Sequence, residues 1–471
     1  MAKPRFCTKA CTDKRSCDFK KLDSSREVYL DYTGSMVPPA SLISDGHELL
    51  RELVLGNPHS HNAASCRASG LVEQGRRDTL EFVGASEENY MCAFTNNATH
   101  AIKLIAESFP YDPETAIVIL SDNHNSCHGI REFAARAGAS VFYVPLEADL
   151  TVKTETLHAI LQSCAAKMSR GLFVYPAQSN FSGVLHPLSW IKDAQDLGFQ
   201  VLLDTAAYLP AHQFQCDVWQ PDYIVGSYYK LFGYPTGIGC LIAKKSAAAT
   251  LKRPWYAGGN VQFASVLVHH HLLERDATAF EDGTVSFLTI PLISLGLKYM
   301  QSIGLNVIEE HNRVLMLQLE EGLQQIKHSN GKSLLALYGP RAETGMRGSA
   351  LACNFTYNTG KVINCYLVEQ CAMKSNISIR SGMFCNPGCG ERALEYDEAT
   401  EVACFKNISS LAFSIPEFSK CMNNSPGAVR ISVGFPTTSA EIEQFVNFSK
   451  TMVDYEDEDS LCFKWELNWR K

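Results

Sequence analysis

The sequence predicts an α/β fold in which a mainly parallel sheet, covered by helices on both faces, is followed by a smaller α+β domain. Between residues 65 and 300, short apolar runs alternate with longer amphipathic stretches, as buried parallel strands alternate with covering helices. After residue 300 a long amphipathic stretch over 305–326 is followed by isolated strand-like runs. We therefore expect a large domain over residues 26–300 and a small domain over residues 301–471.

Length and charge limit the classes of protein to which the chain can belong. Its 471 residues are enough for two domains with sizeable cores. A net charge of −8 gives no reason to expect a nucleic-acid partner, and no apolar run is long enough to predict a membrane span. The N-terminus has basic residues but no apolar region of the kind that directs secretion. We expect a cytoplasmic protein whose polar, aperiodic residues 1–25 form a disordered tail.

The chain has 17 cysteines, which is a high number for a cytoplasmic protein. In a reducing compartment they are expected to be free thiols, most of them buried as small apolar groups. Cys7, Cys11 and Cys17 lie near one another, but their spacing matches no tetrahedral zinc pattern and a fourth ligand is missing. The consecutive residues His269 to His271 would point in different directions on either a strand or a helix. The sequence therefore predicts no metal site.

The expected elements follow one another in the order that this fold requires. Short apolar runs predict strands over 28–31, 116–120, 141–144, 172–175, 201–203, 223–225, 349–355 and 429–433. Amphipathic stretches predict helices over 99–109, 157–167 and 305–326. A closing helix is expected from Ser439, because Thr438 and Glu441 are spaced for a capping box. Residues 387–426, rich in Gly, Asn, Ser and acidic residues, are expected to form a long loop.

Two charged side chains follow strands at the carboxyl ends, where sheets of this kind bind ligands. Asp204 comes directly after the run 201–203 and is either a helix cap or the partner of a protonated pyridine nitrogen. Lys230 lies in a glycine-containing loop after the run 223–225 and is either a surface lysine or an amine that forms a Schiff base. A carboxylate for a pyridine nitrogen and a reactive amine are the pair that a pyridoxal cofactor requires.

Polar residues also follow three further strands. Residues 95–99 precede a helix, whose unpaired N–H groups and dipole attract a phosphate. His124 follows the strand 116–120 and is either a capping or core histidine or a ring that stacks on a flat ligand. Gln178 and Asn180 follow the strand 172–175 and offer amides to a ring hydroxyl. With the two charged residues above, these groups make up the parts of a pyridoxal 5′-phosphate site.

Six longer motifs resemble those of the class V aminotransferases of fold type I. Within that class they resemble the cysteine desulfurases, and most of all the NifS-like N-terminal domain of the molybdenum cofactor sulfurases. They cover residues 28–450 in the family's order. The motifs are Gly56-Asn-Pro-His-Ser60, Tyr175-Pro-Ala-Gln-Ser-Asn-Phe-Ser-Gly183 with Pro187-Leu-Ser-Trp-Ile191, Ser227-Tyr-Tyr-Lys-Leu-Phe-Gly-Tyr-Pro-Thr-Gly237, Phe280-Glu-Asp-Gly-Thr284, Arg380-Ser-Gly-Met-Phe-Cys-Asn-Pro-Gly388 and Gly427-Ala-Val-Arg-Ile-Ser-Val-Gly-Phe435. The resemblance implies a seven-stranded type of sheet in the large domain, pyridoxal 5′-phosphate as cofactor, L-cysteine as substrate and a homodimer.

The resemblance also implies a role for each residue that would hold the cofactor. Lys230 would form the Schiff base, Asp204 would bind the pyridinium nitrogen and His124 would stack on the ring. Asn180, and less directly Gln178, would bond the ring hydroxyl. The residues implied for the phosphate are Ala98, Thr99 and Ser227, and the residue implied to reach the cofactor of the neighbouring subunit is Asn260, in the segment Gly258-Gly-Asn260.

Substrate and sulfur chemistry are implied for residues of the small domain. Arg430 matches the arginine that grips the substrate carboxylate, and Arg380 is a second candidate for this role. Cys385 matches the second cysteine of the family's Gly-Cys-Phe-Cys-Asn motif, in which Met383 replaces the first. A loop flanked by glycine and proline is a poor place to bury a thiol, so Cys385 is the expected nucleophile and Cys389 the runner-up. Cys385 would carry the sulfur as a persulfide before passing it to an acceptor.

The chain departs from the family in two places. It ends shortly after the closing helix, so we expect no C-terminal domain of the kind that receives the molybdenum cofactor in full-length relatives. The family motif Asp-His-Ala-Gly-Ala is here Asp31-Tyr-Thr-Gly-Ser35. The sulfur acceptor therefore stays open between the molybdenum cofactor, its carrier protein and another acceptor. Two alternative functions are a pyridoxal-dependent C–S lyase or aminotransferase-class enzyme with another amino-acid substrate, and a catalytically silent homologue that acts as a binding protein.

Overall fold

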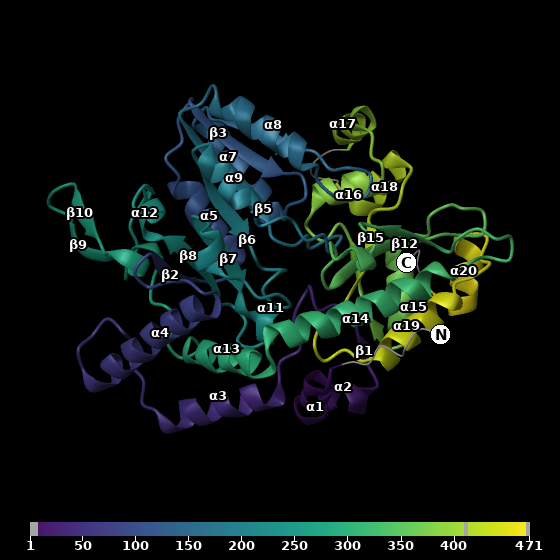
Figure 1. The fold of residues 1–471 in the computed structure, drawn as a ribbon, viewed down its shortest axis with the longest axis horizontal. Helices are drawn as coiled ribbons and strands as arrows, with labels where there is room; N and C mark the ends of the chain where they lie inside the picture. Colours follow the sequence, from purple (N-terminus) through teal and green to yellow (C-terminus); the bar gives the residue numbers. More distant parts are fainter. Residues whose placement is uncertain (1–7, 409–412, 468–471) are drawn as a thin grey trace.

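The computed structural model describes residues 8–408 and 413–467. Its centre is a seven-stranded sheet with the strand order β2-β8-β7-β6-β5-β3-β4 (Figure 1). The strands are β2 (Tyr90–Thr95), β3 (Thr115–Leu120), β4 (Ser140–Val144), β5 (Arg170–Pro176), β6 (Phe199–Asp204), β7 (Tyr223–Ser227) and β8 (Gly239–Lys244). Strands β7, β6, β5, β3 and β4 pair in parallel, and β8 is antiparallel to both of its neighbours. The predicted mainly parallel sheet is confirmed.

Helices cover both faces of this sheet, which explains why its strands are apolar almost throughout. On β3, Ala116, Val118 and Leu120 belong to one core and the alternating residues Ile117 and Ile119 belong to the other, as the period of two requires. The first core is closed by α4 (Ala63–Phe82), α8 (Thr154–Ala165), α9 (Trp190–Asp196) and α13 (Pro291–Ile303), and the second by α5 (Ala98–Ser108) and α7 (Ile130–Arg136).

The C-terminal part of the chain forms a separate four-stranded sheet, in the order β11-β12-β15-β14. Its strands are β11 (Leu335–Tyr338), β12 (Ala350–Phe355), β14 (Arg380–Gly382) and β15 (Ala428–Ser432). The helices α14 (Leu305–Gln324), α15 (Cys365–Lys374) and α19 (Ser439–Lys450) accompany it (Figure 1). The expected capping box of the closing helix is confirmed, since the Thr438 side chain accepts from the Glu441 N–H while the Glu441 side chain accepts from the Thr438 N–H.

The start of the chain packs with this C-terminal sheet. Strand β1 (Val28–Tyr29) pairs in parallel with β13 (Ile377–Ser378), and Val28 and Leu30 belong to the C-terminal core. Asp31 also forms a parallel bridge with Ser432. Residues 28–31 thus join the C-terminal unit, although the sequence predicts them in the large domain over residues 26–300.

The N-terminal residues contradict the expected disordered tail. They form α1 (Lys9–Asp18) and α2 (Lys20–Ser25), so the prediction is wrong for residues 8–25, while residues 1–7 lie outside the described part. Phe19 and Cys11 are buried, and the guanidinium of Arg15 pairs with Glu441 at 3.1 Å. The segment has few apolar residues, but these residues and one buried ion pair dock it on distant parts of the chain.

The expected long loop over 387–426 is also wrong. The structure has three helices there, α16 (Pro387–Ala393), α17 (Glu398–Asn407) and α18 (Ile415–Met422), with residues 409–412 outside the described part. Cys404 and Cys421 form a disulfide between α17 and α18, with their Cα atoms 5.8 Å apart. This corrects the expectation of free thiols throughout, because the helical pair brings together two cysteines that are 17 residues apart in sequence.

The remaining elements connect these units. They are α3 (Ala40–Glu52), α6 (Asn125–His128), α10 (Cys216–Trp219), α11 (Tyr228–Phe232), α12 (Lys245–Ala248), β9 (Val261–Ser265), β10 (His270–Leu273), α20 (Glu458–Trp465) and the 3₁₀ turns Asp276–Phe280 and Ala342–Thr344. Strands β9 and β10 make an antiparallel hairpin that projects from the molecule (Figure 1). Among the described residues, no helix has both the length and the apolar character that crossing a membrane requires.

The stability of the fold should depend on pH through His128. This histidine ends α6, and its burial lowers its pKa to about 4, against about 6.5 for an exposed histidine. The unfolded chain therefore takes up a proton near pH 6.5 that the folded chain resists until about pH 4. The contribution of His128 to the free energy of unfolding is fully present above the pKa of the unfolded chain. It falls as the pH drops through that value, by about 2 kcal/mol between pH 7.5 and 5. Urea unfolding at the two pH values, compared between the wild type and a variant without this histidine, measures this loss.

Two variants isolate this contribution. His128→Gln removes the titrating group and should lower the pH-dependent loss of stability by that amount, whatever its own stability. His158→Gln serves as the control, since its ring is part of an exposed pair with Asp193. Equal pH dependence of the wild type and His128→Gln would contradict the assignment.

Candidate active site

Loops from several strands meet at one edge of the large sheet and line a cavity of ≈ 300 Å³. Strands β2, β3, β5, β6 and β7 all point their carboxyl ends toward this edge, because β2 and β7 both run opposite to β8. The expected site residues that line the cavity are Ala98, Thr99, His124, Gln178, Asn180, Asp204, Ser227 and Lys230. The structure therefore brings together side chains that are spread over more than a hundred residues of sequence.

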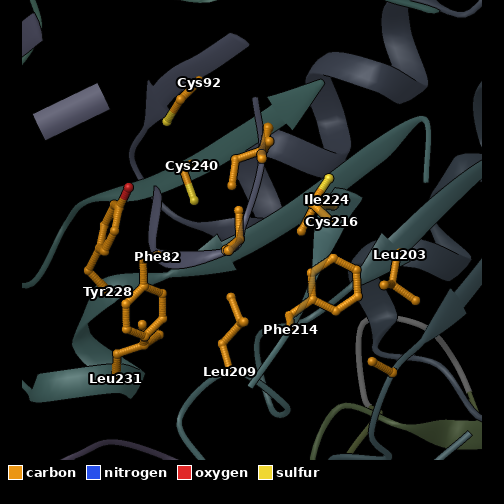
Figure 2. Close-up of a cluster of buried hydrophobic side chains, with 14 of the residues drawn as sticks. Phe82, Cys92, Leu203, Leu209, Phe214, Cys216, Ile224, Tyr228, Leu231 and Cys240 are labelled. Atoms are coloured by element: carbon orange, nitrogen blue, oxygen red, sulfur yellow. The ribbon is translucent and has the colours of Figure 1, made fainter. Parts of the chain in front are cut away.

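Lys230 reaches this cavity because its neighbours are anchored in the core. It lies on the one-turn helix α11, directly after β7, and the side chains of Tyr228 and Leu231 on the same turn are buried. Figure 2 shows both residues within the apolar cluster that also contains Phe82. The Tyr228 hydroxyl is 2.7 Å from the Thr79 hydroxyl. Burial lowers the pKa of the Lys230 amine, and the Asp204 carboxylate partly opposes this. A buried amine with a lowered pKa is readily available as a nucleophile or base.

Asp204 is the last residue of the central strand β6 and is 8% exposed. Its Oδ1 accepts a hydrogen bond of 2.9 Å from the Ala206 N–H, but residues 206–211 form turns and no helix begins there, so the helix-cap alternative is wrong. The carboxylate also acts on the cavity, because it opposes the lowering of the pKa of His124 that burial causes. A carboxylate in this position can hold a proton on a ring nitrogen placed against it. One carboxylate thus fixes the turn after β6 and also lines the cavity.

The N-terminus of α5 forms the end of the cavity that suits a phosphate. The Asn97 side chain caps the helix by accepting from the His100 N–H, and the Ala98 N–H donates to the Ser227 hydroxyl at 2.9 Å. The Thr99 hydroxyl is 2.8 Å from the hydroxyl of Ser126. Hydroxyls and N–H groups at the positive end of a helix dipole favour an anion. Ser126 was not expected from the sequence, although it stands two residues after His124.

The two amides after β5 differ in their partners. Gln178 is 1% exposed, and neither amide atom of its side chain has a hydrogen-bond partner among the described residues. Leaving a buried amide unpaired costs free energy, so this side chain fits a polar group of a bound ligand. Asn180 instead uses its side chain within the protein, where Nδ2 donates to the Phe384 carbonyl at 2.7 Å and Oδ1 accepts from Asn386 at 2.9 Å.

The groups that line the cavity can be matched to the functional groups of pyridoxal 5′-phosphate. The cavity offers an amine with a lowered pKa, a carboxylate at a strand end, a helix N-terminus for the phosphate and an unpartnered amide. Each of these groups matches one functional group of the cofactor. The donor set therefore fits the cofactor that the resemblance implied.

The two expected substrate arginines share one carboxylate. Asp31 accepts from Nη2 of Arg430 at 2.8 Å and from Nη2 of Arg380 at 2.6 Å. Neither arginine is among the residues that line the cavity, but both are close enough to lower the pKa of Lys230. Asp31 was not expected as a site residue, although it follows a predicted strand directly, as Asp204 does. One carboxylate between two guanidinium groups leaves a net positive charge for a carboxylate ligand.

The structure separates the remaining expected residues. Cys385 is exposed, on the turn that precedes α16, whereas Cys389 is buried and its thiol pKa is raised by burial. Neither thiol is among the residues that line the cavity. Asn260 is also buried, and its side chain accepts from the Ala257 N–H and donates to Asp282 within its own chain. Of the two cysteines, Cys385 is the accessible one.

Comparison with known proteins places this site in a family. A model of the class-V aminotransferases matches residues 28–445. Molybdenum cofactor sulfurase of Oryza sativa subsp. japonica is 31% identical over 93% of this chain and 57% of its own length, and that of Bos taurus is 31% identical over 92% of this chain and 51% of its own. The chain thus spans about half the length of these relatives.

Solved structures agree on the fold. The apo cysteine desulfurase of Thermococcus onnurineus NA1 superposes with a TM-score of 0.75 at 20% identity, covering 96% of this chain and 99% of its own. The cysteine desulfurase CsdA of Escherichia coli gives 0.74 at 18% identity, over 94% and 98% of the two chains. The sheet, the strand-end site and the family match lead to one conclusion: this chain belongs to the class-V aminotransferase family, with the fold of its pyridoxal 5′-phosphate-dependent enzymes.

Proposed function

We propose that this chain is a cysteine desulfurase, which converts L-cysteine to L-alanine and retains the sulfur as a persulfide on Cys385. The observation that carries the proposal is the position of Cys385. Its thiol is exposed, and the turn that holds it is bonded to Asn180, which lines the cofactor cavity. Cys389 is a poorer candidate for the nucleophile, because its side chain is buried.

The residues of the cavity divide the work on the substrate. Bound pyridoxal 5′-phosphate supplies an electron sink for the substrate carbon next to the amino group. Lys230 moves the proton at that carbon, a task for which its lowered pKa suits it. Asp204 would hold a proton at the ring nitrogen, and His124 would bind the ring. Arg430, with Arg380 as second candidate, binds the substrate carboxylate through charge-assisted hydrogen bonds.

The sulfur step takes place on Cys385. Its thiolate attacks the Sγ atom of the substrate cysteine, so that an S–S bond forms as the substrate C–S bond breaks. The carbon fragment gains a proton and leaves as alanine, and the enzyme holds Cys–S–SH. Cysteine and the enzyme thiol thus give alanine and the enzyme persulfide, with no other reactant required.

The acceptor and the assembly belong to the same proposal. The relatives' name supports the molybdenum cofactor, or a protein that carries it, as the final acceptor. A homodimer is supported by the hairpin β9–β10, whose apolar tip residues Val266, Leu267 and Val268 are exposed. In such a dimer the segment around Asn260 would serve the cofactor of the neighbouring subunit. The composition of the chain supports a cytoplasmic enzyme without a nucleic-acid or membrane partner.

The test is an assay of purified protein with pyridoxal 5′-phosphate, L-cysteine and a thiol reductant. We expect alanine and sulfide in equal amounts, and a loss of both by at least about 10²-fold in Cys385→Ser. The variant should keep the absorbance of the bound cofactor. Cys66→Ser is the matched control, because Cys66 is also an exposed free thiol.

The outcomes separate the candidate functions. Unchanged turnover in Cys385→Ser would show that the enzyme does not use a persulfide, as expected for a C–S lyase. If the chain binds the cofactor but turns over no sulfur amino acid, the catalytically silent binding protein is the remaining candidate function. Transfer of sulfur from the loaded wild type to desulfo-molybdenum cofactor then identifies the acceptor.

A further inference from the structure

The turn that carries Cys385 has an unfavourable backbone. The Asn386 N–H bonds the Met383 carbonyl at 2.9 Å, which closes a four-residue turn, and both central residues, Phe384 and Cys385, have positive φ angles of 53° and 57°. The left-handed region costs a residue with a side chain about 1 kcal/mol or more. Neither central residue is a glycine, so the surrounding structure must hold the turn in place.

Three hydrogen bonds fix the backbone and side chains of this turn from the large domain. The Asn125 N–H donates to the Cys385 carbonyl at 2.6 Å, and the Asn180 amide donates to the Phe384 carbonyl. The Asn386 amide in turn donates to the side-chain Oδ1 of Asn180 at 2.9 Å. The Phe384 ring is buried against Phe181, with ring centres 5.1 Å apart. The carbonyls of both central residues of the turn are thus bonded to the large domain.

Beneath the turn lies a buried charge that the proposed reaction does not use. Asp122, at 0% exposure, accepts from the Asn386 amide at 2.6 Å and from the Ser179 hydroxyl at 2.8 Å through Oδ1. Its Oδ2 is 2.9 Å from Nε2 of His186, which is also buried. Burial raises the pKa of Asp122, but the hydrogen bond from His186 and the other donors outweigh this and lower it. A buried carboxylate with every oxygen bonded is a rigid anchor.

Asn386 connects the anchor to the turn. Its two amide hydrogens serve Asp122 and Asn180, while its side-chain oxygen caps α16 by accepting from the Cys389 N–H at 3.2 Å. The start of α16, directly after the turn, also packs tightly on the large domain at Gly388, where a Cβ atom would lie 2.2 Å from the Ser121 carbonyl oxygen. Together these contacts join the ends of β3 and β5 to the nucleophile.

We propose that the buried triad of Asp122, His186 and Asn386 positions Cys385 for sulfur transfer, by holding its turn in a left-handed conformation against the cofactor cavity. These are positioning residues, since none of them touches the substrate. The inference rests on the proposed function, in which Cys385 is the nucleophile, but the geometry of the turn does not depend on that function. It follows that the persulfide would be carried on a tethered turn.

Two variants test the triad separately from helix capping and from folding. Asn386→Ser keeps an oxygen that can cap α16 but loses both amide donors, and Asp122→Asn keeps the shape and removes the charge. Asn364→Ser is the matched control, because Asn364 caps α15 by accepting from the Tyr366 N–H and lies outside the turn. A second control, His158→Gln, breaks an exposed His–Asp pair with a distance of 3.0 Å, similar to that of the buried pair.

The first measurements need no cofactor. In both test variants we expect amide hydrogens of residues 383–390 to exchange about tenfold faster than in the wild type, while the exchange of the central sheet stays unchanged. The rate at which iodoacetamide alkylates Cys385, followed by mass spectrometry of its peptide, should change in the same variants. Turnover of L-cysteine should lose about 10- to 100-fold in kcat, as expected for a displaced reacting atom, with a much smaller change in KM.

Each result decides one of the two proposals. Wild-type exchange, alkylation and kcat in folded Asn386→Ser and Asp122→Asn would overturn the positioning role. Equal effects in Asn364→Ser would mean that the loss of any helix cap has these consequences, which would also overturn the positioning role. If the wild type releases no alanine from cysteine, the proposed function fails, while exchange and alkylation still decide whether the triad holds the turn. If Asp122→Asn does not fold, Asn386→Ser alone gives the answer.

Discussion

Replacing Lys230 by alanine should lower the turnover of L-cysteine by about 10⁴-fold, at the upper end of what one acid–base group contributes. Lys230 is the lysine among the described residues that lines the cavity, and in the proposed reaction its amine would both hold the cofactor covalently and move a proton. The buried neighbours Tyr228 and Leu231 anchor the turn without it, so the variant should fold. Sulfide release under saturating cofactor and cysteine measures the loss, and Lys192→Ala, at an exposed lysine, serves as control.

The lowered pKa of Lys230 gives this prediction a pH signature. Because burial lowers the pKa, the neutral amine is available at a lower pH than for an exposed lysine. The rising limb of kcat/KM against pH should therefore lie below the usual lysine value of about 10.4. In Lys230→Ala this limb should disappear, and added methylamine, which titrates near its own pKa, should restore part of the activity. Retention of more than one per cent of wild-type turnover without added amine would contradict the assignment.

Most of the cofactor cavity could be predicted from the sequence because a simple rule brings its residues together. Asp204, Lys230 and His124 each follow a recognisable apolar run, and the carboxyl ends of parallel strands meet at one edge of a sheet. Asp31 follows such a run as well. Its partners could not be predicted, because β1 pairs with β13, almost 350 residues further along the chain, and neither strand has more than two residues.

Other features were out of reach because they depend on contacts between distant segments. The helices α17 and α18 lie in a segment rich in loop-forming residues, and the Cys404–Cys421 disulfide follows from their packing. The triad under Cys385 consists of one residue from each of three segments, joined by hydrogen bonds that no local pattern encodes. The local sequence shows a strand end or a cap, but not which buried charge it will meet.

Arg430 should be the second residue with a large effect. Its side chain is 2% exposed, with Nη1 donating to the Asn180 carbonyl at 2.7 Å and Nη2 to Asp31. Its Nε has no partner among the described residues. A guanidinium this well held in a buried position binds a carboxylate strongly, so Arg430→Ala should lower kcat/KM for L-cysteine by about 10³-fold. Arg380, whose side chain is 48% exposed, should contribute less, about tenfold on truncation.

Cysteamine, which is cysteine without its carboxylate, separates binding of that group from general damage to the site. If Arg430 grips the carboxylate, the wild type should favour cysteine over cysteamine, and Arg430→Ala should lose this preference while its cysteamine turnover changes little. Truncation also leaves the Asp31 carboxylate with one guanidinium partner in place of two, so Arg430→Lys, which keeps the charge, controls for folding. Arg313→Ala, at an exposed pair with Glu310, controls for the loss of a surface arginine. An equal fall for both substrates in Arg430→Ala would mean that the arginine holds Asp31 and Asn180 in place and that the carboxylate is bound elsewhere.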